Sequence, residues 1–347
     1  MSTPSQLRLG NVVTVSPFGG PGGTAPRGRS GLPNDGADFG PDTPGTTTGG
    51  FMEAEEALRS GGGIVQLAPG APIAIRSAVT FYSGVHVFGN GATLLNAAKG
   101  PTPFRTDPST VFFRTEIRGP LVLDQNFAPK GVALTVTSAQ RSRFDVSIEN
   151  FNGSVGLEMT VNDAVPKSLD GNWGGQNRNN RVWVEGHKGT TLVRIAGTEG
   201  CAVTLNDFFV VSGNMMGMDG SRVRLIDFVQ NCDNNLVYDA SLSTHASAAA
   251  GSCVFHFNSV GGASKVRRNR IYKSTLDNNA PATNTRVAIF GGQTALNELL
   301  GMQYGVNPPN PVIEATPTDV FNAVDLMTNG RWVAGRPVPG SGGAAVY

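Results

Sequence analysis

The stretch from Gly61 to Leu95, GGGIVQLAPGAPIAIRSAVTFYSGVHVFGNGATLL, constrains the fold of this chain most strongly. Hydrophobic residues alternate with others in short runs, as at Ile73 and Ile75, and turn residues such as Pro69-Gly70 separate the runs. Alternation with a period of two predicts strands that bury one face. Because the intervening segments are too short for crossover helices, the strands are expected to form a coil of parallel strands whose successive turns stack.

Composition supports an all-β chain. The 347 residues include 46 glycines, while charged residues make up 15% and aromatic residues 7%. These values are typical of a turn-rich β protein and argue against a helical enzyme or a coiled coil. The net charge of +1 gives no general attraction to nucleic acid. Cys201, Cys232 and Cys253 lack metal-ligand spacing and are expected to be small buried residues, so we predict no metal and no cofactor.

The ends of the chain differ from its centre. Residues 1–50 hold 12 glycines and 7 prolines and cannot build a core of their own. They are predicted to be either a disordered leader or an arm that orders against a partner subunit. The first residues lack the apolar core of a secretory signal, and no apolar run is long enough for a membrane span. This pattern predicts a protein made in a cytoplasm, without membrane insertion, which can leave in a particle released by lysis.

Three regions are predicted. Residues 1–50 form the arm, residues 51–304 the coil of strands, and residues 305–347 a proline- and glycine-rich tail or cap with a short helix at 319–327. Within the second region, Phe51 to Ser60 has the pattern of a short amphipathic helix that ends at Gly61-Gly62-Gly63. A helix there is well placed to cover the open end of the coil.

The same residues resemble a known superfamily. Asn34-Asp-Gly-Ala-Asp, the helix with Glu53-Ala54, Gly61-Gly-Gly-Ile-Val-Gln-Leu-Ala-Pro-Gly and Ser83-Gly-Val-His-Val-Phe-Gly-Asn-Gly are similar to the opening of the pectate-lyase-like right-handed parallel β-helix superfamily. Phage tailspikes, polygalacturonase-like hydrolases and polysaccharide lyases share this opening. The resemblance covers about residues 34–96. It implies a homotrimer of tailspike type, in which the N-terminal arm contacts other virion proteins.

A possible internal repeat follows residue 180. Asn180-Arg-Val-Trp-Val-Glu, Cys201-Ala-Val-Thr-Leu-Asn-Asp and Ser221-Arg-Val-Arg-Leu-Ile-Asp align on Val182, Val203 and Val223. The spacing of these valines predicts that they stack in successive coils, together with inward-facing Val184, Leu205 and Leu225. The residues between them would then form an outward ladder.

This ladder supplies the candidate binding residues. Trp183, Asn206, Arg222 and Arg224 are predicted to bind carbohydrate, with Trp183 stacking on a sugar face and the polar groups binding hydroxyl or acidic groups. The same face could instead be buried against another subunit, where Trp and Arg are also enriched, or could be ordinary solvated surface.

The candidate catalytic residues are Glu185, Asp207 and Asp227. In the predicted register Asp207 and Asp227 lie one coil apart, near the separation of a retaining glycosidase pair, and Glu185 and Asp227 lie two coils apart, near that of an inverting pair. The adjacent Asp-Asp pair of polygalacturonases is absent from the sequence, which disfavours a hydrolase. A lyase would need acids and bases of the types found at Asp233, Asp239, Arg267, Arg268 and Lys273, but no spacing links these residues.

Two functions are therefore predicted. The favoured one is a structural or receptor-binding spike or fibre of a phage particle, located in the virion and in contact with host surface polysaccharide. The alternative is a polysaccharide-degrading enzyme, a lyase or a glycoside hydrolase.

Overall fold

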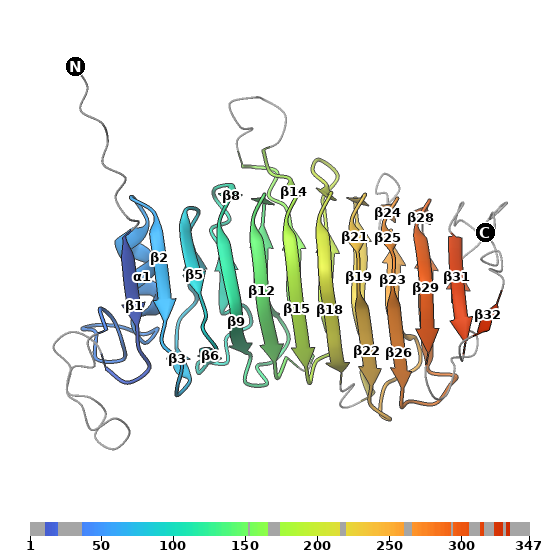
Figure 1. Ribbon diagram of the computed structural model, residues 1–347, viewed down its shortest axis with the longest axis horizontal. Helices are drawn as coiled ribbons and strands as arrows, with labels where there is room; N and C mark the ends of the chain where they lie inside the picture. The colour runs from blue at the N-terminus through green and yellow to red at the C-terminus, as the bar shows by residue number, and fades with distance from the viewer. Residues whose placement is uncertain are drawn as a thin grey trace.

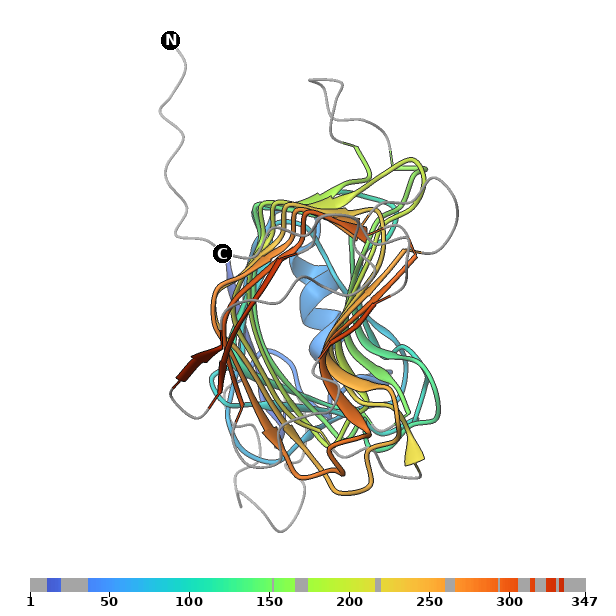
Figure 2. The same cartoon turned by 90° about the vertical axis from the view of Figure 1, so that its right-hand side faces the viewer.

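The computed structural model describes residues 11–19, 37–151, 153–165, 174–215, 220–259, 266–292, 294–304, 313–315, 323–328 and 331–333. These residues form a right-handed parallel β-helix, as predicted, in which three sheets run along one elongated body (Figure 1). Seen along the long axis, the coils lie one behind another, and α1 (Phe51–Leu58) lies at the first coil (Figure 2).

Sheet A, which faces the viewer in Figure 1, has sixteen strands. Its strands are β1 (Val12–Val15), β2 (Gly63–Leu67), β3 (Ile73–Ile75), β5 (Val85–Phe88), β6 (Thr93–Asn96), β9 (Glu116–Asp124), β12 (Arg143–Glu149), β15 (Arg181–His187), β18 (Asp207–Met215), β21 (Leu236–Val237), β22 (Ala240–Thr244), β25 (Arg270–Ile271), β26 (Ser274–Asn278), β29 (Glu298–Tyr304), β31 (Ala323–Thr328) and β32 (Arg331–Val333).

Sheet B lies on the opposite side and sheet C is a narrow corner sheet. Sheet B comprises β4 (Val79–Phe81), β7 (Phe104–Thr106), β10 (Val132–Thr137), β13 (Val155–Thr160), β16 (Thr191–Ala196), β19 (Arg224–Gln230), β23 (Ser252–Asn258), β27 (Thr285–Gly291) and β30 (Ile313–Ala315). Sheet C comprises β8 (Phe112–Phe113), β11 (Ala139–Gln140), β14 (Asn177–Arg178), β17 (Val203–Thr204), β20 (Cys232–Asp233), β24 (Val266–Arg267) and β28 (Thr294–Ala295).

Stacked aliphatic and aromatic side chains fill the centre. Phe228, Phe257 and Phe290 of sheet B form one internal column, with ring centroids 4.8 Å apart in each step. Parallel strands place the same position of successive coils about 4.8 Å apart, so identical side chains meet face to face. Burial of such columns along the whole body is the main favourable term of the fold.

A ladder of side-chain hydrogen bonds holds the corner between sheets C and A. Asn206 Oδ1 accepts from the backbone N–H of Asn180 at 3.1 Å, and Asn235 Oδ1 accepts from that of Asn206 at 3.2 Å. The amide groups also bond to one another, since Asn206 Nδ2 donates to Asn235 Oδ1 at 3.0 Å. The buried ladder positions are Thr115, Ser142, Asn180, Asn206, Asn235, Asn269 and Asn297.

These ladder positions define the coils of the structure. Their spacing runs from 26 residues, between Asn180 and Asn206, to 38 residues, between Ser142 and Asn180. The residue before each ladder position has a positive φ, between 48° at Arg114 and 56° at Leu296. A left-handed residue followed by a side chain that bonds to the next coil makes the sharp turn from sheet C into sheet A.

The predicted register of the valine repeat is wrong. Val182 belongs to β15 in sheet A, Val203 to β17 in sheet C, and Val223 directly precedes β19 in sheet B. All three valines are fully buried, so their inward direction was predicted correctly. Leu205, also predicted to point inward, is 44% exposed, because it occupies the left-handed corner position. Period-two patterns identify the buried face of a strand, but they do not say to which sheet a strand belongs.

The two ends of the chain also contribute strands. β1 lies in the segment predicted as an arm, yet it pairs in parallel with β2 and extends sheet A at its first edge. β31 pairs in parallel with β29 and continues sheet A after residue 304. The helix predicted at 319–327 is therefore wrong where it overlaps β31. Residues 1–10 and 20–36 of the arm and most of the tail lie outside the described residues.

The predicted helix at Phe51 is confirmed and covers the first coil. Phe51 packs edge-on against Phe81, with ring centroids 5.7 Å apart, and Ala54 and Leu58 are buried with it. Glu55 lies on the same buried face and accepts a hydrogen bond from the backbone N–H of Tyr82 at 3.1 Å. Burial raises the pKa of Glu55 well above its usual range, only partly offset by this hydrogen bond.

Candidate functional site on the outer face of sheet A

A groove of about 250 Å³ crosses four neighbouring strands, β9, β12, β15 and β18, on the outer face of sheet A. Its walls include Gly119 and Pro120 of β9, Asp145 and Ser147 of β12, and Trp183 and Glu185 of β15. The groove lies where the strand register is irregular. Between Ile117 and Leu121, β9 bulges opposite the single residue Asp145, and the register shifts again after Val182. Bulges of this kind redirect side chains and often border functional sites.

Two carboxylates face this groove from adjacent strands. Asp145 pairs with Trp183, and Ser147 pairs with Glu185, so Asp145 and Glu185 occupy a diagonal of the sheet. Strand spacing and rise place their Cβ atoms about 8 Å apart. Arg143 Nη2 lies 3.3 Å from Asp145 Oδ2, whereas Glu185 is exposed. Among the described residues, Asp145 forms an ion pair and Glu185 forms none.

An aromatic column begins at the groove and runs along the body. Trp183 stacks on Phe209, Phe209 on Tyr238, and Tyr238 on Tyr272, with ring centroids 4.6, 5.1 and 5.6 Å apart. Phe209 is the extra residue of the bulge after Val182. The guanidinium of Arg143 covers the other face of Trp183, 4.3 Å from the ring centroid. The rings therefore present their edges, and the tyrosines their hydroxyl groups, to the outside.

Polar columns run beside the aromatic column. The strand register aligns Ser147, Glu185, Ser212, Ser241 and Thr275 on successive coils, two residues after Trp183 and three residues after each of the other three rings of the aromatic column. The next outward column aligns Glu149, His187, Asn214, Ser243 and Asp277. A strip of hydroxyl, amide and carboxylate groups next to aromatic edges provides both hydrogen-bonding and apolar contacts, which are the two kinds of contact that a sugar chain offers.

The predicted residue Asp227 lies on sheet B and not in this groove. Its Oδ1 is 2.7 Å from His256 Nδ1, and its Oδ2 accepts from Arg224 Nη1 at 2.8 Å. Arg194 lies at 4.0 Å from the same carboxylate and at 3.5 Å from Glu158. Burial alone would raise the pKa of Asp227, but the hydrogen bond from His256 and the Arg224 guanidinium outweigh it and lower that pKa.

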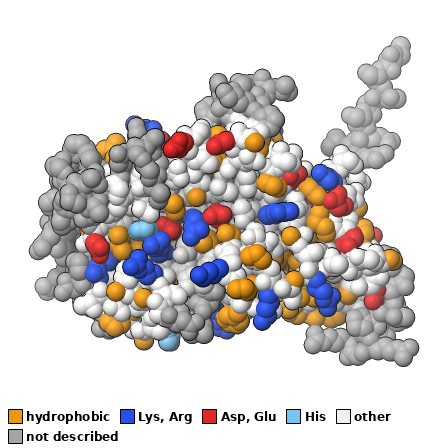
Figure 3. All heavy atoms as spheres, turned by 180° about the vertical axis from the view of Figure 1, so that it is seen from behind, with side chains coloured by type: hydrophobic (Ala, Val, Ile, Leu, Met, Phe, Trp, Pro, Cys, Tyr) orange, Lys and Arg blue, Asp and Glu red, His pale blue; other side chains and the backbone are white. Residues whose placement is uncertain are grey.

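The residues of this sheet B ladder neutralise one another. Acidic and basic side chains alternate across the back of the molecule, where Figure 3 shows them intermingled. The side chain of Asp227 is 3% exposed and that of His256 is 12% exposed, so little of either group is accessible to solvent. The arrangement is that of a salt-bridge ladder.

Only two of the predicted site residues come together. Trp183 and Glu185 share the groove, but both faces of the Trp183 ring are occupied, so the predicted stacking of a sugar on this ring is not possible in the structure. Asn206 is fully buried in the corner ladder, with its amide engaged by Asn177, Asn180 and Asn235, and it cannot bind a ligand.

The remaining predicted residues are scattered. Arg224 is paired with Asp227 on sheet B, and Arg222 is exposed just before the same strand. Asp207 begins β18 in sheet A and pairs with Arg181 and Leu236, so it does not stack on Asp227. Burial raises the pKa of Asp207, and Arg181 opposes that change. The predicted outward ladder is therefore wrong, because Trp183, Thr204 and Arg224 lie on sheets A, C and B. Both predicted acid pairs are wrong as well, because each joins an acid of sheet A to Asp227 on sheet B.

Sequence reasoning missed Asp145, Phe209, Tyr238 and Tyr272. A signal for this group exists in the asparagine ladder. Counting from each ladder position, Trp183, Phe209, Tyr238 and Tyr272 all come three residues later. Alignment on Asn180, Asn206, Asn235 and Asn269 instead of the valines would have stacked these four aromatic residues.

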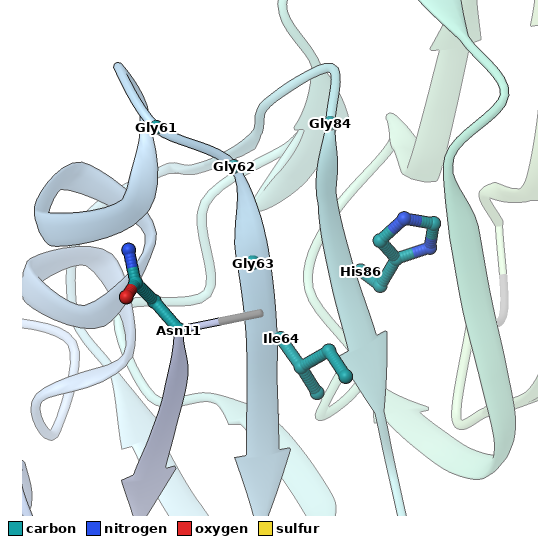
Figure 4. Close-up of a pocket in the computed structure, with 7 residues that line it drawn as sticks. All are labelled: Asn11, Gly61, Gly62, Gly63, Ile64, Gly84 and His86. Atoms are coloured by element: carbon teal, nitrogen blue, oxygen red, sulfur yellow. The ribbon is translucent and has the colours of Figure 1, made fainter. Parts of the chain in front are cut away.

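A second hollow, of about 520 Å³, lies beside the first coil. Backbone of Gly61, Gly62, Gly63 and Gly84 forms much of its wall, and His86 projects from β5 toward it (Figure 4). Asn11 adds one amide group from the strand on the other side of β2. A single imidazole and a single amide on glycine backbone do not form a convergent set of chemical groups, so we do not consider this hollow the functional site.

Within the described ranges, no group of three His, Cys, Asp or Glu side chains is arranged to hold a metal ion. None of the helices that the structure describes is long and apolar enough to span a membrane.

Comparison with known proteins yields distant structural similarities. No protein-family model and no curated protein matches the sequence. Among solved structures, the ORF18 protein of Geobacillus virus E2 is 13% identical, with a TM-score of 0.41 over 84% of this chain. The chain covers 60% of the length of that viral protein.

Two further structures have the same kind of similarity. PfbA, a surface adhesin of Streptococcus pneumoniae, is 11% identical over 80% of this chain and 84% of its own, with a TM-score of 0.35. A mutant tailspike protein of E. coli bacteriophage HK620, in complex with a pentasaccharide, is 12% identical over 88% of this chain and 66% of its own, with a TM-score of 0.30. The assignment of the fold rests on the strand pairing of the chain itself.

Proposed function

We propose that this protein is a spike or fibre component of a phage particle that binds host surface polysaccharide through the outer face of sheet A. The observation that carries the proposal is the groove at Asp145 and Glu185, from which the aromatic column and the polar columns extend along the body. An elongated, rigid β-helix keeps these columns straight, so a linear glycan could contact several coils at once.

The chemistry of the groove fits sugar hydroxyl groups. Carboxylate oxygens of Asp145 and Glu185 accept hydrogen bonds, while the hydroxyl groups of Ser147 and of the serines that follow can donate or accept. Acids inside the groove would repel a carboxylate or phosphate at that point. The groove is therefore suited to an uncharged stretch of polysaccharide.

A binding experiment tests this proposal. Immobilised capsular and O-antigen polysaccharides would be screened by biolayer interferometry with the full-length protein and with an Asp145→Asn/Glu185→Gln variant. We expect at least one glycan to bind and the variant to lose about tenfold in affinity. Glu199→Gln, which changes an exposed acid in the turn before β17, is the matched control and should bind as the wild type does. Equal binding by the groove variant would contradict the proposal.

A second candidate function is cleavage of the glycan at the same groove. With their Cβ atoms about 8 Å apart, Asp145 and Glu185 could bring their carboxyl groups to the separation of an inverting pair, which is about 6.5–9.5 Å. In that case one acid would protonate the leaving oxygen while the other activates water. Release of reducing ends from a bound polysaccharide, abolished by either single variant, would favour this enzyme. Binding without release would favour the spike.

The assembly remains part of the proposal. We propose a homotrimer incorporated in the virion, on the basis of the sequence resemblance of residues 34–96 to tailspikes. The predicted contact of the N-terminal arm with other virion proteins concerns residues that lie mostly outside those described. Light scattering of the purified protein at micromolar concentration should give the mass of three chains, and a monomer mass would contradict this part.

A further inference from the structure

We propose that α1 is a pH-sensitive cap, which loosens from the first coil when the carboxyl group of Glu55 loses its proton. Glu55 lies on the face of α1 that packs against the first coil and is fully buried. Its Oε2 accepts the backbone N–H of Tyr82 at 3.1 Å, whereas its buried Oε1 has no hydrogen-bond partner among the described residues. A carboxylate can accept about four hydrogen bonds, so this environment suits the uncharged acid better than the anion.

The side chains around Glu55 do not neutralise a negative charge there. Arg59, at the end of the helix, lies 3.5 Å from Glu56, and its guanidinium covers the ring of Tyr82 at 4.4 Å from the centroid. Glu56 also accepts a hydrogen bond from the Tyr82 hydroxyl. The strands that pack against α1, which are β1, β2 and β4, contain no titratable residue. The only basic group close to this part of α1 is therefore engaged by a different acid.

The other titratable groups of the neighbouring segments are acids as well. Asp38 and Asp42 lie in the described segment before α1, and Asp107 follows β7. Burial raises the pKa of Glu55 most, and the charge of Glu56 raises it further, while the hydrogen bond from Tyr82 only partly opposes them. Because the docked helix retains the proton to higher pH than an exposed helix would, docking is strongest at acid pH and weakens as the pH rises through the folded value.

Glycine pairs on both sides of α1 provide hinges for such a movement. Gly49 and Gly50 precede the helix with φ of 60° and 84°, and Gly62 and Gly63 follow it with φ of 69° and 153°. Glycine changes its backbone conformation at low steric cost, and hinges consist of a few residues of this kind at the ends of an element. A helix of eight residues is too short to be stable by itself, so its position depends on its packing.

Movement of α1 affects one end of the body and not the coils behind it. The helix lies at the first coil in Figure 2 and takes no part in the pairing of the three sheets. Local opening of such a peripheral element needs less free energy than global unfolding. β4 is the outermost described strand of sheet B, and Phe51 of the helix packs on Phe81 of that strand. The open cap would expose a strand edge and apolar side chains, which favour association with another chain.

Hydrogen exchange of the full-length protein tests this inference. Exchange of a peptide that covers 51–58 would be compared with that of a reference peptide from 224–230 in the middle of sheet B, after correction for the intrinsic effect of pH on amide exchange. We expect the opening of α1, relative to the reference, to increase at least about tenfold between about pH 6 and pH 9 in the wild type.

Variants of the helix identify the group that titrates. Glu55→Gln keeps an oxygen that can accept the Tyr82 N–H but carries no charge, so it should abolish the increase. Glu55→Met, which removes the buried polar group altogether, should do the same and guards against an effect of the amide itself. Glu53→Gln is the matched control, because it changes an acid of the same helix whose carboxylate binds Thr46 and Thr48. Its exchange should retain the pH dependence of the wild type.

Three results would overturn the inference. One is equal protection of α1 at both pH values in the wild type, and another is an increase that persists in both Glu55 variants. The third is a parallel increase in the reference peptide, which would mean that the whole protein opens and not the cap. The glycan groove lies on other coils and takes no part in this experiment, so failure of the cap would leave the proposed function untouched.

Discussion

The outer faces of sheets A and B are both built from columns of stacked side chains, but they differ in how their charged groups are paired. On sheet B, Glu158, Arg194, Asp227 and His256 follow one another along the register and neutralise one another. On sheet A, the exposed Glu185 has serines as its register neighbours and no cation within the described residues near it. Repetition alone therefore does not make a site. A column becomes available to a ligand when adjacent coils do not satisfy its polar groups.

The largest expected effect comes from breaking the sheet B ladder. Asp227→Ala leaves Arg224 and His256 without their acid, and loss of one partner of a buried ion pair should cost about 3–5 kcal/mol of unfolding free energy. Urea unfolding at neutral pH measures the change. Because the pKa of Asp227 is lowered in the folded state, this stabilisation should be present above about pH 4 and be lost as the pH falls further. A decrease of less than about 1 kcal/mol in the free energy of unfolding would show that the ion pairs of the ladder do not stabilise the fold.

A buried acid without a cation sharpens the contrast. Glu55 is as buried as Asp227, but its pKa is raised, so the contribution of Glu55 to stability should be fully present below about pH 4 and be lost as the pH rises through the folded value. Glu55→Gln should remove this decline and gain about 1–2 kcal/mol at alkaline pH. Urea midpoints at about pH 5 and pH 9 test it, with Glu199→Gln as the control. Identical pH dependence in wild type and Glu55→Gln would contradict it.

A smaller effect is expected within the aromatic column of sheet A. Phe209 stacks on two rings and Tyr272 on one. Phe209→Ala should therefore cost about 1–2 kcal/mol, and Tyr272→Ala about half as much. Thermal unfolding of the two variants side by side provides the comparison. If the two variants lose the same free energy of unfolding, each ring stabilises the protein through its own burial and not through stacking on its neighbours.

The smallest expected effect is at the groove itself. Glu185 is exposed and unpaired within the described structure, so Glu185→Ala should change the unfolding free energy by less than about 0.5 kcal/mol. The same variant should weaken glycan binding if the groove is the site. A marked loss of stability would show that Glu185 has a structural partner. The two sheets would then not differ in how their acids are paired.

Much of the fold could be predicted from local pattern. The alternation at Ile73 and Ile75 identified buried strand faces, and the helix beginning at Phe51 was expected from its spacing of apolar residues. The candidate site was predicted only at Trp183 and Glu185. The valine alignment failed because a coil contains strands of three sheets, each with a buried valine, so similar short segments recur within one coil as well as between coils.

By itself the sequence determined that this chain winds short, one-sided strands into a solenoid, because alternation and turn residues act over a few neighbouring positions. Only the tertiary structure decided which side chains are stacked, because that depends on where each corner turns and how many residues each loop inserts between Asn180, Asn206, Asn235 and Asn269. Asp145 and Glu185 are 40 residues apart in the chain and meet across one strand boundary. Hydrogen bonding between coils, which no local pattern specifies, brings them to the same groove.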